Sequence, residues 1–215
     1  MYRTTEVRWF HPGVLPPSIE RWFERGEEGV ELEPPRVDHY LRLRGSDALN
    51  IKLREGRLEI KRRTGERTET RFSEDVVGAV EHWQKWGFDL AETDTQAMGG
   101  ASSSTWIAVR KERSIRTYGI DDRPVPAPTE PVDVTVACEW ELTRVDVGGQ
   151  IWWTTALEAF GDQTRQRVAL LSVAKLVFGL QDRPPLRIED SRGYPGWLDT
   201  LSEGGHEEAR SLWRS

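Results

Sequence analysis

The chain has 215 residues, of which 37% are hydrophobic and 31% charged, and its net charge is −6. This length fits one domain with a sizeable core, and the negative balance disfavours a nucleic-acid scaffold. A single cysteine, Cys138, excludes an internal disulfide, and no apolar run approaches the roughly 18 to 20 residues that a membrane helix needs. The charged residues between Arg3 and His11 are unlike a signal peptide, so the cytoplasm is the expected location.

The first strand is predicted from Thr4 to Phe10, where polar and apolar residues alternate. Its polar face carries Thr4, Glu6 and Arg8. The next segments are predicted to be a short helix at 19–25 after two prolines, an acidic loop at 26–35 and a second strand at 37–44. One face of that second strand carries Tyr40, Arg42 and Arg44.

The clearest alternation runs from residue 49 to residue 63 and predicts a β-hairpin that turns at Glu55-Gly56. The polar faces of its two strands carry, in order, Asn50, Lys52, Arg54, Arg57, Glu59, Lys61 and Arg63. An extension of the second strand through Thr68 toward Phe72 is compatible with the pattern. An antiparallel sheet with one face in water would show the same alternation.

A helix is predicted to follow the hairpin, because Ser73 is a suitable N-cap and Gly87 a suitable stop after Trp86. The small residues at 99–104 lack the lysine of a phosphate-binding P-loop and are predicted to be a flexible connection. Beyond them, a strand is predicted from Trp106 to Tyr118 and a proline-rich linker at 121–131. The basic residues of this strand are Arg110, Lys111, Arg113 and Arg116.

A second hairpin is predicted from 132 to 160 around Gly148-Gly149. Its first strand places Glu139 and Glu141 on one face, about 7 Å apart at their Cα atoms. On the returning strand, Glu158 shares a face with Trp152, Thr154 and Ala156. The two neighbouring carboxylates are a plausible metal pair. The remaining elements are predicted to be a helix at 163–178 capped by Asp162, a turn and short helix at 191–198, and a frayed tail at 203–215.

At least five predicted strands, drawn from both halves of the chain, have one apolar face and one face with charges of both signs. A closed antiparallel barrel with helices packed outside would place all the charged faces in one lumen. We therefore expect an α+β fold, with residues 1–215 forming a single tunnel domain. Basic side chains in such a lumen suit a polyanion, and the carboxylates suit a bridging divalent cation.

These motifs resemble the CYTH superfamily, the triphosphate tunnel metalloenzymes, over most of the chain. That family includes thiamine triphosphatases, tripolyphosphatases and a class of adenylate cyclases. Its first-strand Glu-x-Glu-x-Lys appears here as Thr4-Thr5-Glu6-Val7-Arg8, with threonine for the leading glutamate and arginine for the lysine. The later motifs are similar to Lys52-x-Arg54, Glu59-x-Lys61-x-Arg63, Lys111-x-Arg113 and Glu139-Trp140-Glu141.

The resemblance implies binding of a small-molecule triphosphate or inorganic polyphosphate. The composition argues against a membrane span and disfavours a nucleic-acid partner. The phosphate-binding residues would be Arg8, Arg42, Lys52, Arg54, Lys61, Arg63, Lys111 and Arg113. Mg²⁺ or Mn²⁺ would be held by Glu6, Glu139, Glu141 and Glu158. The cation would support hydrolysis of the bound compound.

The departures from the family pattern favour an alternative. Losing a carboxylate at Thr4 should weaken the metal site, and the planar fork of Arg8 keeps the charge without the chemistry of lysine. A binding or regulatory module that has lost turnover is therefore the second hypothesis. Two structural alternatives also remain: Glu6 and Arg8 as a cross-strand ion pair, and Lys111 and Arg113 as solvated residues.

Overall fold

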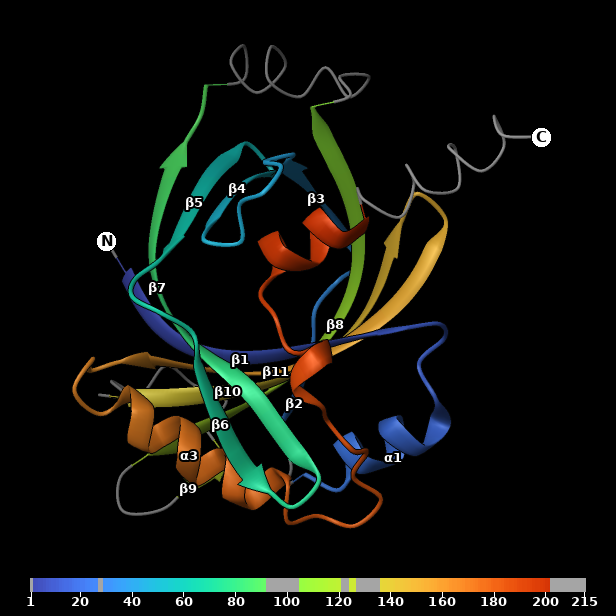
Figure 1. Ribbon diagram of the computed structural model, residues 1–215, viewed down its shortest axis with the longest axis vertical. Helices are drawn as coiled ribbons and strands as arrows, with labels where there is room; N and C mark the ends of the chain where they lie inside the picture. The colour runs from blue at the N-terminus through green and yellow to red at the C-terminus, as the bar shows by residue number, and fades with distance from the viewer. Residues whose placement is uncertain (1, 27–28, 92–104, 121–123, 127–135, 202–215) are drawn as a thin grey trace.

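The first strand, β1 (Tyr2–Pro12), closes the sheet, because it pairs with β11 (Gln150–Gly161) on one edge and with β7 (Val76–Asp89) on the other. The computed structural model describes residues 2–26, 29–91, 105–120, 124–126 and 136–201. In this part of the chain, eight strands form a closed antiparallel barrel in the order β1-β11-β10-β8-β3-β4-β5-β7 (Figure 1). The α+β tunnel fold predicted from the alternating faces is confirmed.

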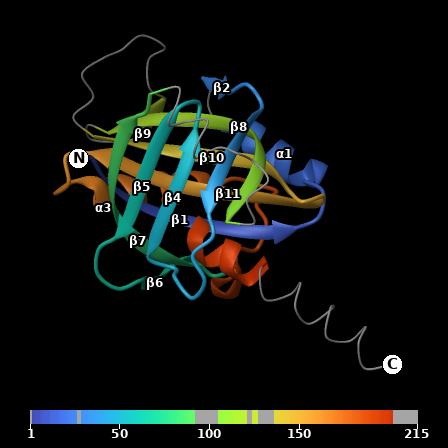
Figure 2. The same ribbon diagram turned by 90° about the horizontal axis from the view of Figure 1, so that it is seen from above.

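The other barrel strands are β3 (Arg36–Leu41), β4 (Leu49–Arg54), β5 (Arg57–Arg63), β8 (Trp106–Ile120) and β10 (Val136–Val147). The strands β2 (Val30–Leu32) and β9 (Pro124–Pro126) pair with β8, and β6 (Thr68–Ser73) pairs with β7. The helices packed outside are α1 (Pro17–Glu24), α3 (Gln166–Val177) and the 3₁₀ turn η1 (Ile188–Asp190). Strands β4 and β5 lie across the direction of β1, β10 and β11 (Figure 2).

The main hydrophobic core lies between the outer face of the barrel and the helices. Trp9, Trp140 and Leu157 point outward from their strands and are fully buried. Helix α1 adds Trp22, whose indole Nε1 donates to the carbonyl of Val177 in α3 at 3.0 Å. Because the apolar faces of the strands are buried here, their polar faces must point into the barrel. In the described ranges, every helix is too short or too polar to cross a membrane.

The two predicted hairpins are present. Strands β4 and β5 are joined by Glu55 and Gly56, whose φ angles of 48° and 75° match a two-residue type I′ turn. Strands β10 and β11 are joined by Gly148 and Gly149, with φ angles of 58° and 83°. Because these turns fix the register, Lys52 lies directly opposite Glu59 on the inner face.

The predicted helix at 73–86 is wrong. Residues 76–89 form strand β7, and Ser73 ends β6, so that Glu74 and Asp75 make the turn of a hairpin. The same polar residues that start a helix also favour a tight turn. Val76, Val77 and Val80 then favour the strand, since β-branched side chains pack well on a pleated sheet and lose freedom in a helix.

Smaller expectations also need correction. Strand β5 ends at Arg63 and does not extend toward Phe72, which belongs to β6. The predicted loop at 26–35 contains β2, which adds to the edge of β8. Asp162 does not cap a helix: its carboxylate accepts from the backbone N–H of Thr164 at 3.0 Å, and α3 begins at Gln166. Outside the described residues lie the predicted loop at 99–104, the predicted tail at 203–215 and most of the predicted linker at 121–131, of which 124–126 is strand β9.

One end of the barrel is covered by the helical segment at 194–201, which agrees with the short helix expected near 191–198. Trp197 stacks on Phe10 with ring centroids 4.5 Å apart, and Tyr194 stacks on Tyr40 at 5.4 Å. The chain is fastened just before this helix, where the Ser191 hydroxyl donates to the carbonyl of Arg8 at 3.0 Å. The segment therefore brings an aromatic group to the inner end of the tunnel.

Candidate functional site

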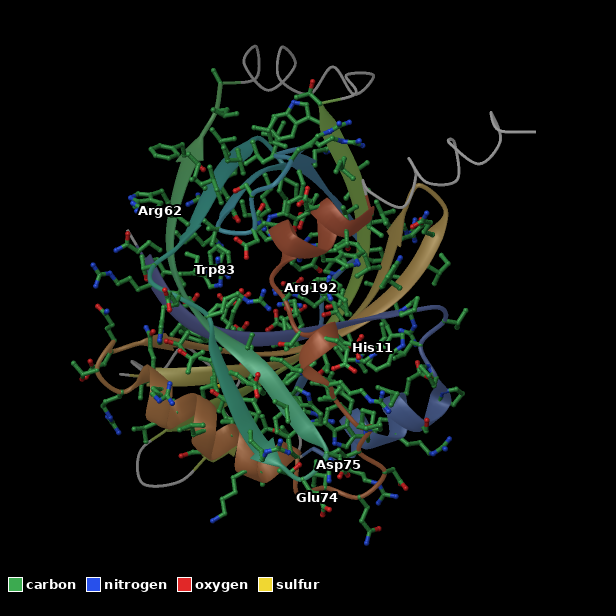
Figure 3. All side chains as sticks on the ribbon, viewed as in Figure 1. His11, Arg62, Glu74, Asp75, Trp83 and Arg192 are labelled. Carbon is green, nitrogen blue, oxygen red and sulfur yellow. The ribbon has the colours of Figure 1, made fainter. Side chains whose placement is uncertain are left out.

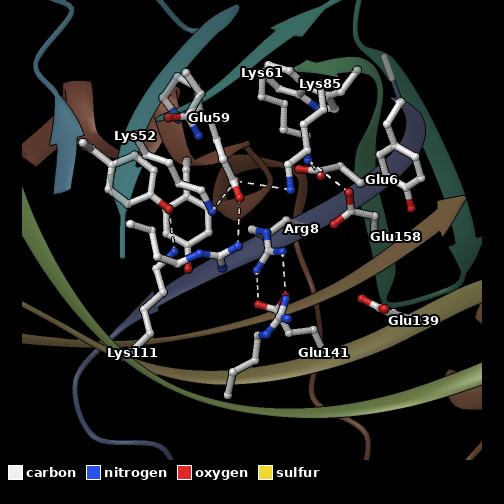
Figure 4. A pocket seen from close by; sticks show the side chains of 18 of the residues that line it. Glu6, Arg8, Lys52, Glu59, Lys61, Lys85, Lys111, Glu139, Glu141 and Glu158 are labelled. Atoms are coloured by element: carbon white, nitrogen blue, oxygen red, sulfur yellow. Dashed lines mark hydrogen bonds and ion pairs between the residues drawn. The ribbon is translucent and has the colours of Figure 1, made fainter. Parts of the chain in front are cut away.

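A cavity of about 250 Å³ lies inside the barrel (Figure 4). Its cationic side chains are Arg8, Arg36, Lys52, Arg54, Lys61, Lys85, Lys111 and Arg113. Its carboxylates are Glu6, Glu59, Glu139, Glu141 and Glu158. Its aromatic residues are Tyr2, Tyr40, Trp83, Phe160 and Tyr194. Strands β1, β10 and β11 carry most of the carboxylates, and the remaining strands carry most of the cations.

The structure brings together most of the residues singled out from the sequence. Six of the eight basic residues and all four of the predicted metal ligands line the cavity. The exceptions are Arg42 and Arg63. Arg42 follows the end of β3 and is exposed, whereas Arg63 pairs with Asp47 at 2.8 Å and with Glu81 at 3.1 Å at the border of the barrel.

Sequence reasoning missed several cavity residues. Lys85 was overlooked because β7 was predicted to be a helix, on which its side chain has no fixed relation to β5. Arg36 lies one residue before the predicted start of its strand. Tyr194 belongs to a segment without alternation, and no signal connects it with the barrel. Arg36, Val37 and Asp38 alternate polar, apolar and polar, so the pattern allows the second strand to begin at Arg36.

Asp38 organises the wall made by β3, β4 and β8. It is fully buried, and its Oδ2 lies 3.0 Å from Nζ of Lys111 and 3.7 Å from Nζ of Lys52. Burial would raise the pKa of Asp38, but the neighbouring lysines and Arg36 lower it below its ordinary value. Lys111 also donates to the hydroxyl of Tyr40 at 2.5 Å, so its amine is held in place. Burial lowers the pKa of Lys111 to about 7, although Asp38 opposes the shift.

Glu59 on β5 is shared by three cations. Its carboxylate lies 2.9 Å from Lys52, 2.8 Å from Arg54 and 3.2 Å from Lys85. Burial opposes ionisation, yet the charges of Lys52 and its neighbours lower the pKa of Glu59 to about 2. Lys52 also lies 3.7 Å from Asp38, whereas Arg54 and Lys85 have only Glu59 as a partner among the described carboxylates, so positive charge remains on this wall.

Glu141 on β10 is saturated with hydrogen bonds. Arg8 donates to both of its oxygens, at 2.6 Å and 3.2 Å, while Arg113 donates to Oε2 at 3.1 Å and the Thr143 hydroxyl to Oε1 at 2.7 Å. Burial would raise the pKa of Glu141, but Arg8 and Arg113 hold it well below its ordinary value. The predicted alternative of a Glu6–Arg8 ion pair is therefore replaced by a pair between Arg8 and Glu141.

The other carboxylates lie side by side on three neighbouring strands. Glu158 is directly opposite Glu6 on β1 and Glu139 on β10. Lys61 reaches between them from β5: its Nζ pairs with Glu6 and lies 3.2 Å from Glu158 (Figure 4). Lys61 lies on the inner face, in contrast to the next residue, Arg62, which points outward (Figure 3).

Glu139 differs from the other four cavity carboxylates. Within the described residues, it has no ion pair or side-chain hydrogen bond. Burial and the adjacent charge of Glu158 raise its pKa to about 7, although Arg113 opposes the shift. This carboxyl group can therefore exchange a proton near neutral pH.

The carboxylates do not fit Mg²⁺ or Mn²⁺ in this arrangement. Such a cation needs free oxygens on several carboxylates that converge on one point. Here the oxygens of Glu141 are taken by two arginines, and Glu6 and Glu158 share the ammonium of Lys61. In the described part of the chain, no group of three or more His, Cys, Asp or Glu residues is arranged to hold a metal ion.

No protein-family model and no curated protein matches the chain. Among solved structures, it is similar to a conserved hypothetical protein from Pyrococcus furiosus, with 13% identity and a TM-score of 0.45 over 90% of this chain and 98% of that one. It is also similar to a protein from Pyrococcus horikoshii, with 10% identity and a TM-score of 0.42 over 94% and 99% of the two chains. The function must therefore be inferred from the side chains of the tunnel.

Proposed function

We propose that the barrel is a tunnel that binds a small polyanion, a compound with a triphosphate or polyphosphate chain. The observation that carries the proposal is the gathering of eight basic side chains around one cavity, where they face five carboxylates and, behind the wall, the buried Asp38. In a partly buried cavity, ammonium and guanidinium groups bind phosphate oxygens through short charge-assisted hydrogen bonds. A polyanion would supply the negative charge that the cavity lacks.

The wall around Glu59 is the most favourable part of the cavity for phosphate. Lys52, Arg54 and Lys85 converge on that single carboxylate, within 2.8 to 3.2 Å. Lys and Arg each have several donors, so most of their N–H groups stay available after one contact. The similarity of this basic hairpin to the CYTH motif supports the same class of ligand, and we propose that the chain is a divergent member of that superfamily.

Hydrolysis of the bound compound is a second candidate function, which the position of Glu139 favours. This carboxylate lines the cavity and has no ion pair among the described residues, so it is free to orient a water molecule beside a bound phosphate. Cations around the phosphate oxygens would stabilise charge in the transition state. A binding module without turnover needs no such group.

Thermal unfolding with tripolyphosphate tests the binding proposal. A ligand that binds only the folded state at 100 times its Kd stabilises the protein by about 2.7 kcal/mol, so the Tm should rise. The double variant Lys52→Ala and Arg54→Ala should lose the shift, because it removes two of the three cations at Glu59. Arg62→Ala is the matched control, since it removes a cation from the outer face of β5 and should keep the shift. A full shift in the double variant would rule out this wall as the site.

Phosphate release tests the second candidate. Tripolyphosphate, thiamine triphosphate and ATP should each be incubated with the wild type, with Mg²⁺, with Mn²⁺ and with EDTA. If Glu139 orients water, Glu139→Gln should retain the Tm shift with tripolyphosphate and lose most of the release. Binding without release by the wild type under all conditions would leave the binding module as the function.

A further inference from the structure

Strands β1, β10 and β11 carry most of the cavity carboxylates and are called the acidic strands below. Cationic side chains of the protein itself form ion pairs with these carboxylates. Arg8 bridges β1 to β10 by binding both oxygens of Glu141, and Lys61 bridges β5 to β1 and β11 by binding Glu6 and Glu158. Arg8 and Glu141 are both 5% exposed, so solvent screens this pair weakly. Lys61 is also placed by Trp83, whose ring centroid lies 5.4 Å from its Nζ.

The ammonium of Lys61 lies where a cation between Glu6 and Glu158 would have to bind. Burial would lower the pKa of Lys61, but Glu158 and Glu6 raise it above its ordinary value, so the amine stays charged. A divalent ion would have to displace this ammonium into a wall that already holds Lys52 and Lys85. Leaving a buried charge without its partner costs several kcal/mol.

We propose that Lys61 and Arg8 replace a divalent metal in this tunnel: they neutralise the acidic strands, and the cavity binds its anion without a metal ion. The part about the anion rests on the proposed function, whereas the exclusion of a divalent ion stands on the ion pairs alone. Glu6, Glu158 and Glu139 lie side by side on adjacent strands. Without Lys61, the carboxylates of Glu6 and Glu158 would face each other with no cation between them and would attract a divalent cation.

A titration with Mn²⁺ tests whether the tunnel excludes a divalent ion. Electron paramagnetic resonance measures binding as a decrease in the signal of the free ion. The wild type should not bind Mn²⁺ up to roughly 1 mM, the weak end of protein sites for divalent ions. The variant Lys61→Met should bind Mn²⁺ with a Kd at least tenfold below this limit. Lys85→Met is the matched control, because it removes the cross-strand neighbour of Lys61 and leaves Glu59 paired with two other cations. It should not gain Mn²⁺ binding.

The proposal is overturned if the wild type binds one Mn²⁺ well below 1 mM and Glu158→Gln weakens that binding. This outcome does not depend on whether Lys61→Met folds. Calorimetry with tripolyphosphate supplies a second measurement: the Kd should be unchanged, within about twofold, between EDTA and Mn²⁺. A requirement for Mn²⁺ would overturn the proposal and retain the proposed function. Absence of binding in both conditions would defeat the proposed function, and the Mn²⁺ titration would still decide whether the tunnel excludes the metal.

Discussion

The guanidinium of Arg8 and the carboxylate of Glu141 are joined by two hydrogen bonds, of 2.6 Å and 3.2 Å, across the intervening strand β11. The residues are 133 positions apart in the chain, and closure of the barrel brings them together. Both are buried, so each neutralises a charge that would otherwise be poorly solvated. The pair is therefore strongly coupled to the integrity of the tunnel.

We expect Arg8→Met to lower the free energy of unfolding by roughly 3 kcal/mol, because it removes the main partner of buried Glu141. Glu141→Leu should cost about as much, since it leaves Arg8 unpaired. In the double variant, the loss in free energy of unfolding should be smaller than the sum of the two single losses by at least about 1 kcal/mol. Urea unfolding of the four proteins measures this coupling, and strictly additive losses would contradict it.

A change at Gly78 separates the strand in the structure from the helix predicted at 73–86. A Cβ atom at this position would collide with the ring of Trp9 and lie 2.7 Å from Cγ2 of Val7. Gly78→Ala should therefore destabilise the protein by roughly 1 to 3 kcal/mol, the usual cost of overpacking a core. In an exposed helix the same change would stabilise by about 1 kcal/mol. Urea unfolding measures the change in the free energy of unfolding, and its sign decides between the strand and the helix.

Alternation was sufficient to predict most of the strands whose inner faces carry the charges, with β7 as the exception. It placed Lys52 and Lys61 on one face of a hairpin, and Glu139 and Glu141 on one face of another. It failed at Ser73, because Ser-Glu-Asp is both a helix start and a turn, and only pairing with distant strands selects the turn. Lys85 was missed for the same reason.

The partners of the cavity charges could not be predicted from the sequence. The carboxylates of Glu6 and Glu141 looked equally suited to a metal, since local pattern says nothing of which cations lie opposite. The register of β1 against β7 and β11 decides that Lys61 reaches Glu6 while Arg8 reaches Glu141. Such contacts depend on barrel closure, which joins strands from both ends of the chain.

Tyr194 is expected to close the tunnel through its ring and not through its hydroxyl. Nζ of Lys111 lies 3.7 Å from the ring centroid, and Cζ of Arg8 lies 5.1 Å from it. The hydroxyl is buried and has no hydrogen-bond partner among the described residues. Tyr194→Phe should therefore change the free energy of unfolding by less than about 1 kcal/mol, whereas Tyr194→Ala should cost about 3 kcal/mol or more. Thermal and urea unfolding measure both, and equal losses would show that the hydroxyl matters.

Glu139 gives the stability of the protein a specific pH dependence. Its pKa rises from the ordinary 4.5 to about 7 in the folded state, because burial and the charge of Glu158 disfavour the ionised form. The folded state thus binds this proton more tightly than the unfolded state, and the resulting stabilisation is complete below pH 4.5 and lost as the pH rises through 7.

Replacing Glu139 with glutamine should remove this dependence. At pH 8 the variant should be more stable than the wild type by roughly 2 kcal/mol, a figure reduced for the partial exposure of the carboxyl group. At pH 4.5 the two should differ little, because the protonated carboxyl and the amide are both neutral. Glu112→Gln is the control, since the side chain of Glu112 is half-exposed and pairs with Arg110 at 3.1 Å. Urea unfolding from pH 4.5 to 8 measures the difference. Parallel profiles for the wild type and Glu139→Gln would mean that the pKa of Glu139 is the same in the folded and unfolded states, near 4.5, and the group could then hold no proton for a reaction near neutral pH.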